Sequence, residues 1–237
     1  MKNSLKIVLG GLMLVSLTAV LPLTTATGRV IAQTTNSSLI ITWEANNYFP
    51  ADFPGKAMIT PGTPVTAAVE EIAGNKLVDL TGAQISWFIN DKLAQNGTGL
   101  KSINFTASPD SNGLVTIRVT VQTPNNSLTD SVSILATAPF SVIDYPSLTN
   151  TLPAGGNVTL TAWPYFFNVS TLSQLTFTWQ LNGQTIKSGN NQLLVQVNTP
   201  QIQSQQILPV ILTTQNTQNP LEFSKNTSVF NIINGNQ

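Results

Sequence analysis

The segment ISWFIND, residues 85–91, has a counterpart in FTWQLNG, residues 177–183. Each segment places an apolar residue two positions before and two after a tryptophan, Trp87 or Trp179, and ends in Asn-Asp or Asn-Gly. Because side chains alternate between the two faces of a strand, each tryptophan shares one face with its apolar neighbours. The closing pairs tolerate positive φ, so each segment is predicted to turn back as a β-hairpin.

The spacing of these two tryptophans predicts the number of domains. Trp87 and Trp179 lie 92 residues apart in a chain of 237 residues, and an immunoglobulin-like sandwich takes about 100 residues. We therefore expect an all-β protein with two tandem immunoglobulin-like β-sandwich domains, residues 34–137 and 138–237. Strict alternation of apolar and polar residues from Leu114 to Val121, with turn-forming clusters on either side, agrees with this fold.

Two segments leave room for more than one local structure. Val65–Val69 is predicted to be a strand, although Ala67–Glu71 could form a helical turn. Ala138–Pro146 joins the two halves and is short and partly apolar. Such a linker favours a restrained tandem over two independently moving domains.

The first 32 residues are predicted to be a secretory signal. Lys2 and Lys6 precede the apolar run 7–23, and small residues follow it. Cleavage is expected after Ala26 or Ala32, with Ala32 favoured. An uncleaved membrane anchor is the alternative, but 17 residues are at the short limit for a span. The chain is therefore expected to be secreted or held in the cell envelope, with membrane contact only through this segment if it stays uncleaved.

The composition excludes several classes of chemistry. The chain has no Cys and no His, which removes thiol catalysis, zinc-thiolate sites and the commonest general base. Only 8% of its residues are charged. Beyond the first 32 residues, seven basic and ten acidic residues remain, a net charge of −3, so no nucleic-acid partner is expected.

The acidic residues form no recognisable catalytic or metal-binding motif. Asp110–Gly113 begins like a calcium loop but lacks the later acidic positions, so a turn built on Asx residues is the favoured interpretation. Seven Asn-x-Ser/Thr triplets, with Asn168 among them, are attributed to the Asn-, Ser- and Thr-rich composition. We expect no enzymatic activity, no metal site and no cofactor.

Two aromatic clusters are the candidate functional surfaces. They follow the first strand of each half, and bulky aromatic side chains are unusual in loops. One interpretation is that they close the ends of the sandwiches or form the interface between the domains. The other is an exposed patch that binds a partner or stacks on sugar rings. The candidate residues are Trp43, Tyr48, Phe49 and Phe53 in the first half and Trp163, Tyr165 and Phe166 in the second.

The Trp-x-apolar-Asn motif resembles the third-strand signature of cysteine-free bacterial immunoglobulin-like and PKD-like domains. The Gly-Asp-Gly turn usual in PKD domains is absent here. The stretches Trp43–Pro50, Pro54–Lys56, Asp144-Tyr145 and Pro164–Phe167 are similar to segments of uncharacterised exported tandem-sandwich proteins from uncultivated bacteria with reduced genomes. That resemblance implies a bacterial envelope or extracellular protein and supplies no catalytic residue.

These observations together predict a non-catalytic structural or adhesion module of the cell envelope, which could be accessory to a surface or pilus-like assembly. The alternative is a receptor domain pair that binds carbohydrate or protein through the aromatic clusters. The expected partners are other envelope or surface proteins, or extracellular glycans.

Overall fold

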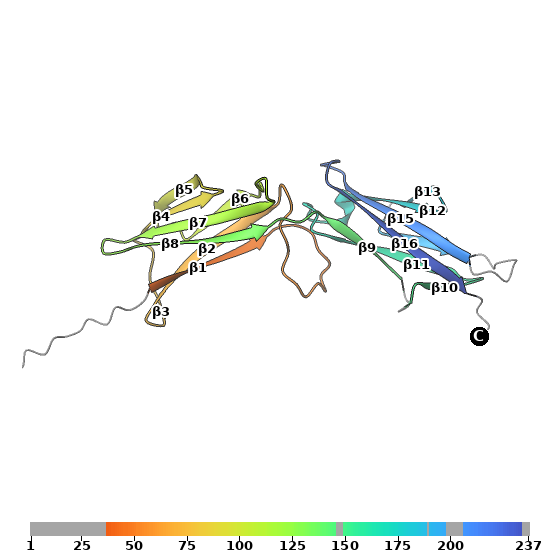
Figure 1. The fold of residues 1–237 in the computed structure, drawn as a ribbon, viewed down its shortest axis with the longest axis horizontal. Coiled ribbons are helices and arrows are strands. Elements are labelled where there is room, and N and C mark those ends of the chain that lie inside the picture. The colour runs from red at the N-terminus through yellow and green to blue at the C-terminus, as the bar shows by residue number, and fades with distance from the viewer. Residues whose placement is uncertain (1–36, 146–148, 189, 198–205, 234–237) are drawn as a thin grey trace, which may run out of the picture. The chain divides into compact units, whose positions relative to one another are not determined.

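The computed structural model describes residues 37–145, 149–188, 190–197 and 206–233, apart from the side chains of Lys187 and Ser188 (Figure 1). Contacts divide the chain into two units, Met1–Thr34 and Thr35–Gln237, and all the described residues belong to the second unit. The predicted signal segment and its cleavage sites lie outside the described residues. No helix in the described ranges is long and apolar enough to cross a membrane.

The first half contains two antiparallel sheets (Figure 1). In one sheet the order is β1-β2-β3, and β6 pairs with β2. In the other the order is β5-β4-β7-β8. The strands are β1 (Ser37–Ala45), β2 (Pro64–Ala73), β3 (Lys76–Leu77), β4 (Gln84–Ile89), β5 (Lys92–Thr98), β6 (Ser102–Thr106), β7 (Leu114–Gln122) and β8 (Ser127–Leu135).

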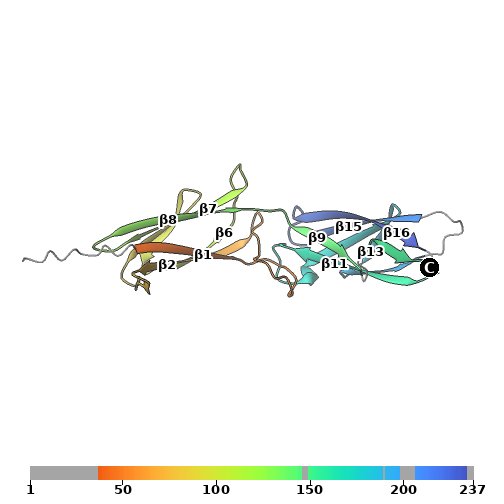
Figure 2. The same cartoon turned by 60° about the horizontal axis from the view of Figure 1, so that its bottom comes forward.

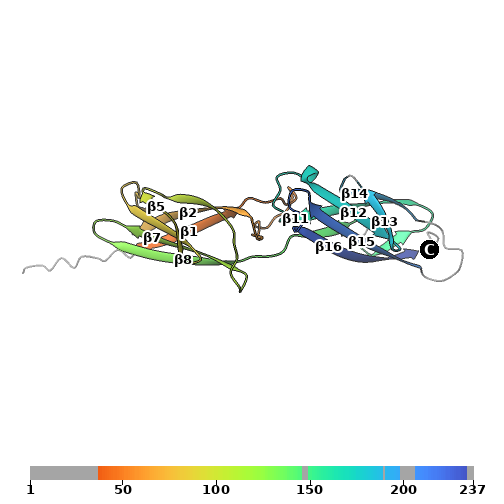
Figure 3. The same ribbon diagram turned by 90° about the horizontal axis from the view of Figure 1, so that it is seen from above.

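The second half repeats this arrangement, with β15 and β16 side by side in Figure 3. Its sheets have the orders β14-β11-β9 and β10-β16-β15-β12-β13, and among the described strands only β10 runs parallel to its partner, β16. The elements are β9 (Phe140–Asp144), β10 (Thr151–Pro153), β11 (Asn157–Tyr165), the 3-10 turn η1 (Leu172–Gln174), β12 (Leu175–Leu181), β13 (Gln184–Ser188), β14 (Gln192–Gln196), β15 (Gln206–Asn216) and β16 (Phe223–Ile233).

Matching strands pair in the same way in both halves. β9, β11 and β14 take the places of β1, β2 and β6, and β13, β12, β15 and β16 those of β5, β4, β7 and β8. In each half the tryptophan lies on a strand by which the chain passes from the first sheet into the second, β4 for Trp87 and β12 for Trp179. The core tryptophan of immunoglobulin domains has the same position. The predicted fold class is confirmed: the chain is all-β, with two tandem immunoglobulin-like β-sandwiches.

The two predicted hairpins form because their turn residues adopt left-handed backbone conformations. Asn90 and Asp91 have φ of 48° and 62°, and Asn182 and Gly183 have φ of 49° and 79°. Positive φ at both central residues gives a type I′ turn, whose twist matches that of the flanking strands. The turns therefore direct β5 back along β4 and β13 back along β12.

Each half has a hydrophobic core of its own, centred on its tryptophan. Trp87 and Trp179 are fully buried. The alternating residues of β7 supply the first core, with Val115, Ile117 and Val119 completely covered. In the second core, Leu160, Val210 and Leu212 are likewise completely covered. The two separate cores agree with the predicted domain boundary near residue 137. The exact position of that boundary stays a prediction.

One local prediction is confirmed and another needs correction. The predicted strand Val65–Val69 is part of β2, and the alternative of a helical turn at Ala67–Glu71 is wrong, because Val65, Ala67 and Val69 alternate into the core with strand periodicity. The expected linker Ala138–Pro146 contains strand β9, which pairs with β11 (Figure 2). Alternation of buried Ser141 and Ile143 with exposed neighbours explains why the segment joins the sheet.

Candidate binding surface

The candidate aromatic residues in β1 and in the loop after it do not all pack against the same core. Trp43 is itself part of β1, on the row of side chains that faces inward, and packs with Phe49 against the first core. The Lys56 ammonium nitrogen lies 3.4 Å from the centroid of the Trp43 ring. Burial lowers the pKa of Lys56, and the Glu44 carboxylate opposes that shift. Trp43 and Phe49 are thus packing residues of the first sandwich.

Tyr48 crosses to the second half. Its backbone N–H donates to the Phe167 carbonyl at 2.7 Å, and its carbonyl accepts from the Phe166 N–H at 2.6 Å. The half-buried Tyr48 ring packs against the second core, and burial raises the pKa of its hydroxyl above the ordinary 10.0. The loop after β1 therefore adds a short antiparallel bridge to the segment after β11.

Four rings from the two predicted clusters, together with Phe140 of β9, form one aromatic cluster. Phe53 lies at its centre, 5.8 Å from Phe49, 5.6 Å from Tyr165 and 5.7 Å from Phe166, each measured between ring centroids. Phe140 of β9 stacks on Tyr165 at 4.9 Å with an interplanar angle of 10°. The edge-to-face contacts of Phe53 are the geometry that the ring quadrupole favours. These contacts between rings of the two halves agree with the interpretation that the aromatic clusters form an interface between the domains.

Phe166 has an unusual backbone for an aromatic residue. Its φ is 63°, although it is buried. A bulky residue in the left-handed region is strained and persists only where its surroundings hold it. Its carbonyl oxygen accepts from the Thr60 hydroxyl at 3.3 Å and the Asn47 amide at 3.5 Å. Hydrogen bonds from the first half thus support the strained residue of the second.

Next to Phe166, the side chain of Asn168 is the centre of a polar network. Its carbonyl oxygen accepts from the Thr63 hydroxyl at 2.7 Å and the Thr60 hydroxyl at 3.2 Å. Its amide nitrogen donates to the Pro61 carbonyl at 3.0 Å, and its backbone N–H donates to Glu222 at 2.7 Å. We call Thr60, Thr63, Asn168 and Glu222 the junction network.

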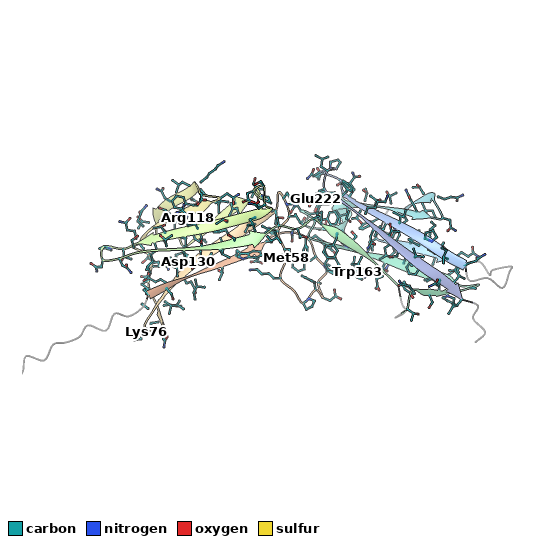
Figure 4. All side chains as sticks on the ribbon, in the orientation of Figure 1. Met58, Lys76, Arg118, Asp130, Trp163 and Glu222 are labelled. Atoms are coloured by element: carbon teal, nitrogen blue, oxygen red, sulfur yellow. The ribbon has the colours of Figure 1, made fainter. Side chains whose placement is uncertain are left out.

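Glu222 closes this network from the turn before β16 (Figure 4). The buried Glu222 carboxylate accepts from the Asn168 backbone with one oxygen and from the Asn216 amide, at 2.6 Å, with the other. Thr60 and Thr63 are also buried, with Thr63 fully covered. Buried polar groups that are hydrogen-bonded stabilise, whereas removal of one partner costs the desolvation of the other.

Sequence reasoning misses the junction network. Asn168 is visible in the sequence only as one of seven Asn-x-Ser/Thr triplets, and its side chain serves hydrogen bonding between the halves. Glu222 stands alone in an uncharged segment, from Ile207 to Ser224, and that isolation is the one sequence signal of a specific role. Thr60 and Thr63 carry no signal in a chain so rich in Thr.

The remaining candidate, Trp163, lies on the outer face of the sheet β14-β11-β9 (Figure 4). Strand register pairs Phe140 with Tyr165, Val142 with Trp163 and Asp144 with Thr161. The inward residues of β11, Leu160 and Ala162, are fully buried, so these three pairs point outward. We call the six outward residues of the three pairs the outer ladder.

The seven candidate residues therefore do not form one site. Phe49, Phe53, Tyr165 and Phe166 are brought together in the aromatic cluster. Tyr48 joins the second core, Trp43 borders the first, and Trp163 lies on the outer ladder. Partner binding through any of them stays a prediction.

The described acidic residues do not assemble a metal site. Within the described ranges no group of three or more Asp or Glu residues could hold a metal ion. Asp110 Oδ1 accepts from the backbone N–H groups of Asn112 and Leu114, at 2.8 and 2.9 Å, as in an Asx turn. A pocket of about 470 Å³ lies beside Thr60 and Pro139, and Glu222, which is already hydrogen-bonded, is the one ionisable residue among the described ones that line it.

Comparison with known proteins gives similarity of fold. No family model matches the chain, and no curated protein sequence matches it. A chimeric titin Z1Z2 structure is 10% identical with a TM-score of 0.34, and the match covers 86% of this chain and 99% of that one. Three N-terminal domains of the outer capsid protein Hoc of bacteriophage RB49 are 15% identical with a TM-score of 0.31, over 84% and 70%.

A third match is to fibronectin(III)-like modules of Clostridium thermocellum CbhA, 9% identical with a TM-score of 0.28, over 82% of this chain and 94% of that one. At such identities and scores these likenesses carry no argument about function. The strand order places the chain, without a family assignment, among cysteine-free tandem sandwiches of immunoglobulin or fibronectin-III type.

Proposed function

We propose that this chain is a non-catalytic, exported structural or adhesion module of the cell envelope, accessory to a larger surface assembly. The observation that carries the proposal is the junction network, in which Asn168 bonds Thr60, Thr63 and Pro61. A module that spaces or presents other surface components has to transmit load between its sandwiches. Directed, partly buried hydrogen bonds at the junction serve that purpose better than a flexible linker.

The composition supports the same proposal. A chain without Cys has no disulfide whose redox state could affect folding outside the cytoplasm. The predicted signal segment, residues 1–32, would deliver it there. Partners are proposed to be other envelope or surface proteins.

Fractionation of cells that express the full chain tests this proposal. The chain is expected in the envelope or medium fraction, digestible by protease added to intact cells, and cross-linked to other surface proteins. Retention in the cytoplasm, or turnover of substrates by the purified chain in a broad hydrolase screen, would contradict it. A receptor that binds carbohydrate is the second candidate, and the outer ladder favours it.

A further inference from the structure

The outer ladder has two aromatic residues, Phe140 and Tyr165, that pack in the aromatic cluster, and two apolar residues, Val142 and Trp163, that lie outside it. Val142 and Trp163 face each other across β9 and β11 and belong to neither hydrophobic core. Phe140 is 42% exposed and Val142 40% exposed. Such a patch on a sheet face marks a site of interaction when polar groups border it.

The polar end of the ladder fixes the position of the indole. The Trp163 Nε1–H donates to Asp144 Oδ2 at 3.3 Å, from the neighbouring strand. The bond occupies the ring's one donor and holds the ring beside an exposed carboxylate. Trp163 and the Asp144 carboxylate therefore lie side by side on the outer face of the sheet.

The area of the patch decides between a protein and a small ligand. An aromatic side chain buries about 150–250 Å² when fully covered, so the partly exposed Phe140, Val142, Trp163 and Tyr165 together offer on the order of 300 Å². A stable protein interface takes about 800 Å² from each partner. A second copy of this chain, or another folded protein, would need far more surface than the ladder supplies.

The chemistry of the border selects the class of ligand. Asp144 is the one charged residue among the six, and uncharged Thr161 and Gln192 lie next to it in the register. A carboxylate disfavours an anionic ligand and accepts hydrogen bonds from hydroxyl groups. A pyranose ring offers both an apolar C–H face and a rim of hydroxyl donors.

From these observations we propose that the outer ladder binds a neutral glycan, with a sugar ring stacked on Trp163 and a hydroxyl bonded to Asp144. This site goes beyond the structural role proposed above, which depends on different residues. Of the seven candidate residues, Trp163 and Tyr165 lie on the outer ladder, and most of the other five are used in packing.

The test is binding of the full chain to an array of neutral oligosaccharides, followed by calorimetry with the oligosaccharide bound best. Wild type is expected to bind, and Trp163→Ala to weaken binding by about tenfold or more because the stacking face is lost. Asp144→Ala should weaken it several-fold. Phe223→Ala removes another exposed aromatic, 55% exposed on β16, and should leave the affinity unchanged.

Other outcomes would overturn the proposal. If wild type binds nothing on the array, or if Phe223→Ala loses as much affinity as Trp163→Ala, the outer ladder is not a glycan site. A wild-type dimer that Trp163→Ala converts to a monomer, measured by sedimentation, would assign the face to a second copy. Thermal unfolding of each variant shows whether it is folded, and Trp163→Phe, which keeps a ring, should retain part of the affinity.

Discussion

The side-chain carbonyl oxygen of Asn168 lies 2.7 Å from the hydroxyl oxygen of Thr63, which is 105 positions earlier in the chain. This contact joins a loop of the first sandwich to the segment that follows β11 in the second. Around it the buried Thr60 and Glu222 complete the junction network. The two sandwiches are therefore connected by specific polar contacts as well as by the covalent chain.

Replacing Asn168 by alanine should destabilise the protein. The change leaves the Thr60 and Thr63 hydroxyls and the Pro61 carbonyl without this partner, at a cost of about 1–3 kcal/mol. Urea titration of the full chain measures the loss. Asn104, which accepts from Thr66 at 2.7 Å on an exposed sheet face, provides the matched control. Asn104→Ala should cost no more than about 0.5 kcal/mol, and equal losses would contradict the special role of Asn168.

The two core tryptophans should differ in their tolerance of phenylalanine. Trp87 Nε1 donates to the Leu100 carbonyl at 2.9 Å, whereas Trp179 Nε1 is buried with no hydrogen-bond partner among the described residues. Trp→Ala at either position should cost about 3–5 kcal/mol. Trp87→Phe should cost about 1 kcal/mol more than Trp179→Phe, because only Trp87→Phe breaks a hydrogen bond. Chemical denaturation of the four variants makes the comparison, and the reverse order would refute it.

Gly99 should not tolerate a side chain. Its φ is +68°, and a Cβ there would lie 2.8 Å from the Thr81 carbonyl oxygen. Gly99→Ala is therefore expected to cost about 1–3 kcal/mol, measured by thermal unfolding. Gly82 serves as the control, since nothing lies within 4 Å of its added Cβ. Gly82→Ala should be neutral or slightly stabilising, and a similar loss at both sites would show that strain at Gly99 is not the cause.

Stability should decline in acid. Backbone N–H groups of Leu114 and Asn112 hold the pKa of Asp110 below its ordinary 3.8. Hydrogen bonds from Thr81, first its N–H and then its hydroxyl, lower the pKa of Asp79 in the same way. A carboxyl whose folded pKa is depressed stabilises above its unfolded pKa, and that contribution disappears as pH falls through the folded value.

Melting temperatures between about pH 5 and pH 2 test this prediction. The melting temperature of wild type should decrease as the pH is lowered beyond about 4. The melting temperature of Asp110→Asn should decrease less steeply, because this variant lacks one of the two carboxyls, Asp79 and Asp110, whose folded pKa is depressed. A wild-type melting temperature that rises on acidification would contradict the assignment.

The sequence predicts the features that local periodicity encodes. Alternation around Trp87 and Trp179 identifies the strands and cores, and the Asn-Asp and Asn-Gly pairs identify the hairpins. Strand β9 is not predicted, and its sequence resembles a linker because its inward face includes a polar residue, Ser141. The Ser141 hydroxyl donates to the Thr214 hydroxyl at 2.8 Å. That partner lies 73 positions away, and no local pattern reveals it.

The candidate surface is predictable only in part for the same reason. Aromatic content locates the segments after β1 and within β11, but not which rings pack against each other. Phe53 meets Phe166 only because the loop of one half reaches the other. The junction network consists largely of ordinary Thr and Asn residues whose role depends on contacts more than 100 positions apart.

The two sandwiches should tumble as one body if the junction network couples them. Backbone ¹⁵N relaxation of the full chain measures this coupling directly, because amides in β7 and β15 report the rotational correlation time of each half separately. Wild type should give one shared correlation time for both strands, and Asn168→Ala should make the two values diverge toward those of smaller, independently tumbling bodies. Two distinct correlation times already in wild type, unchanged by Asn168→Ala, would contradict coupling through the network.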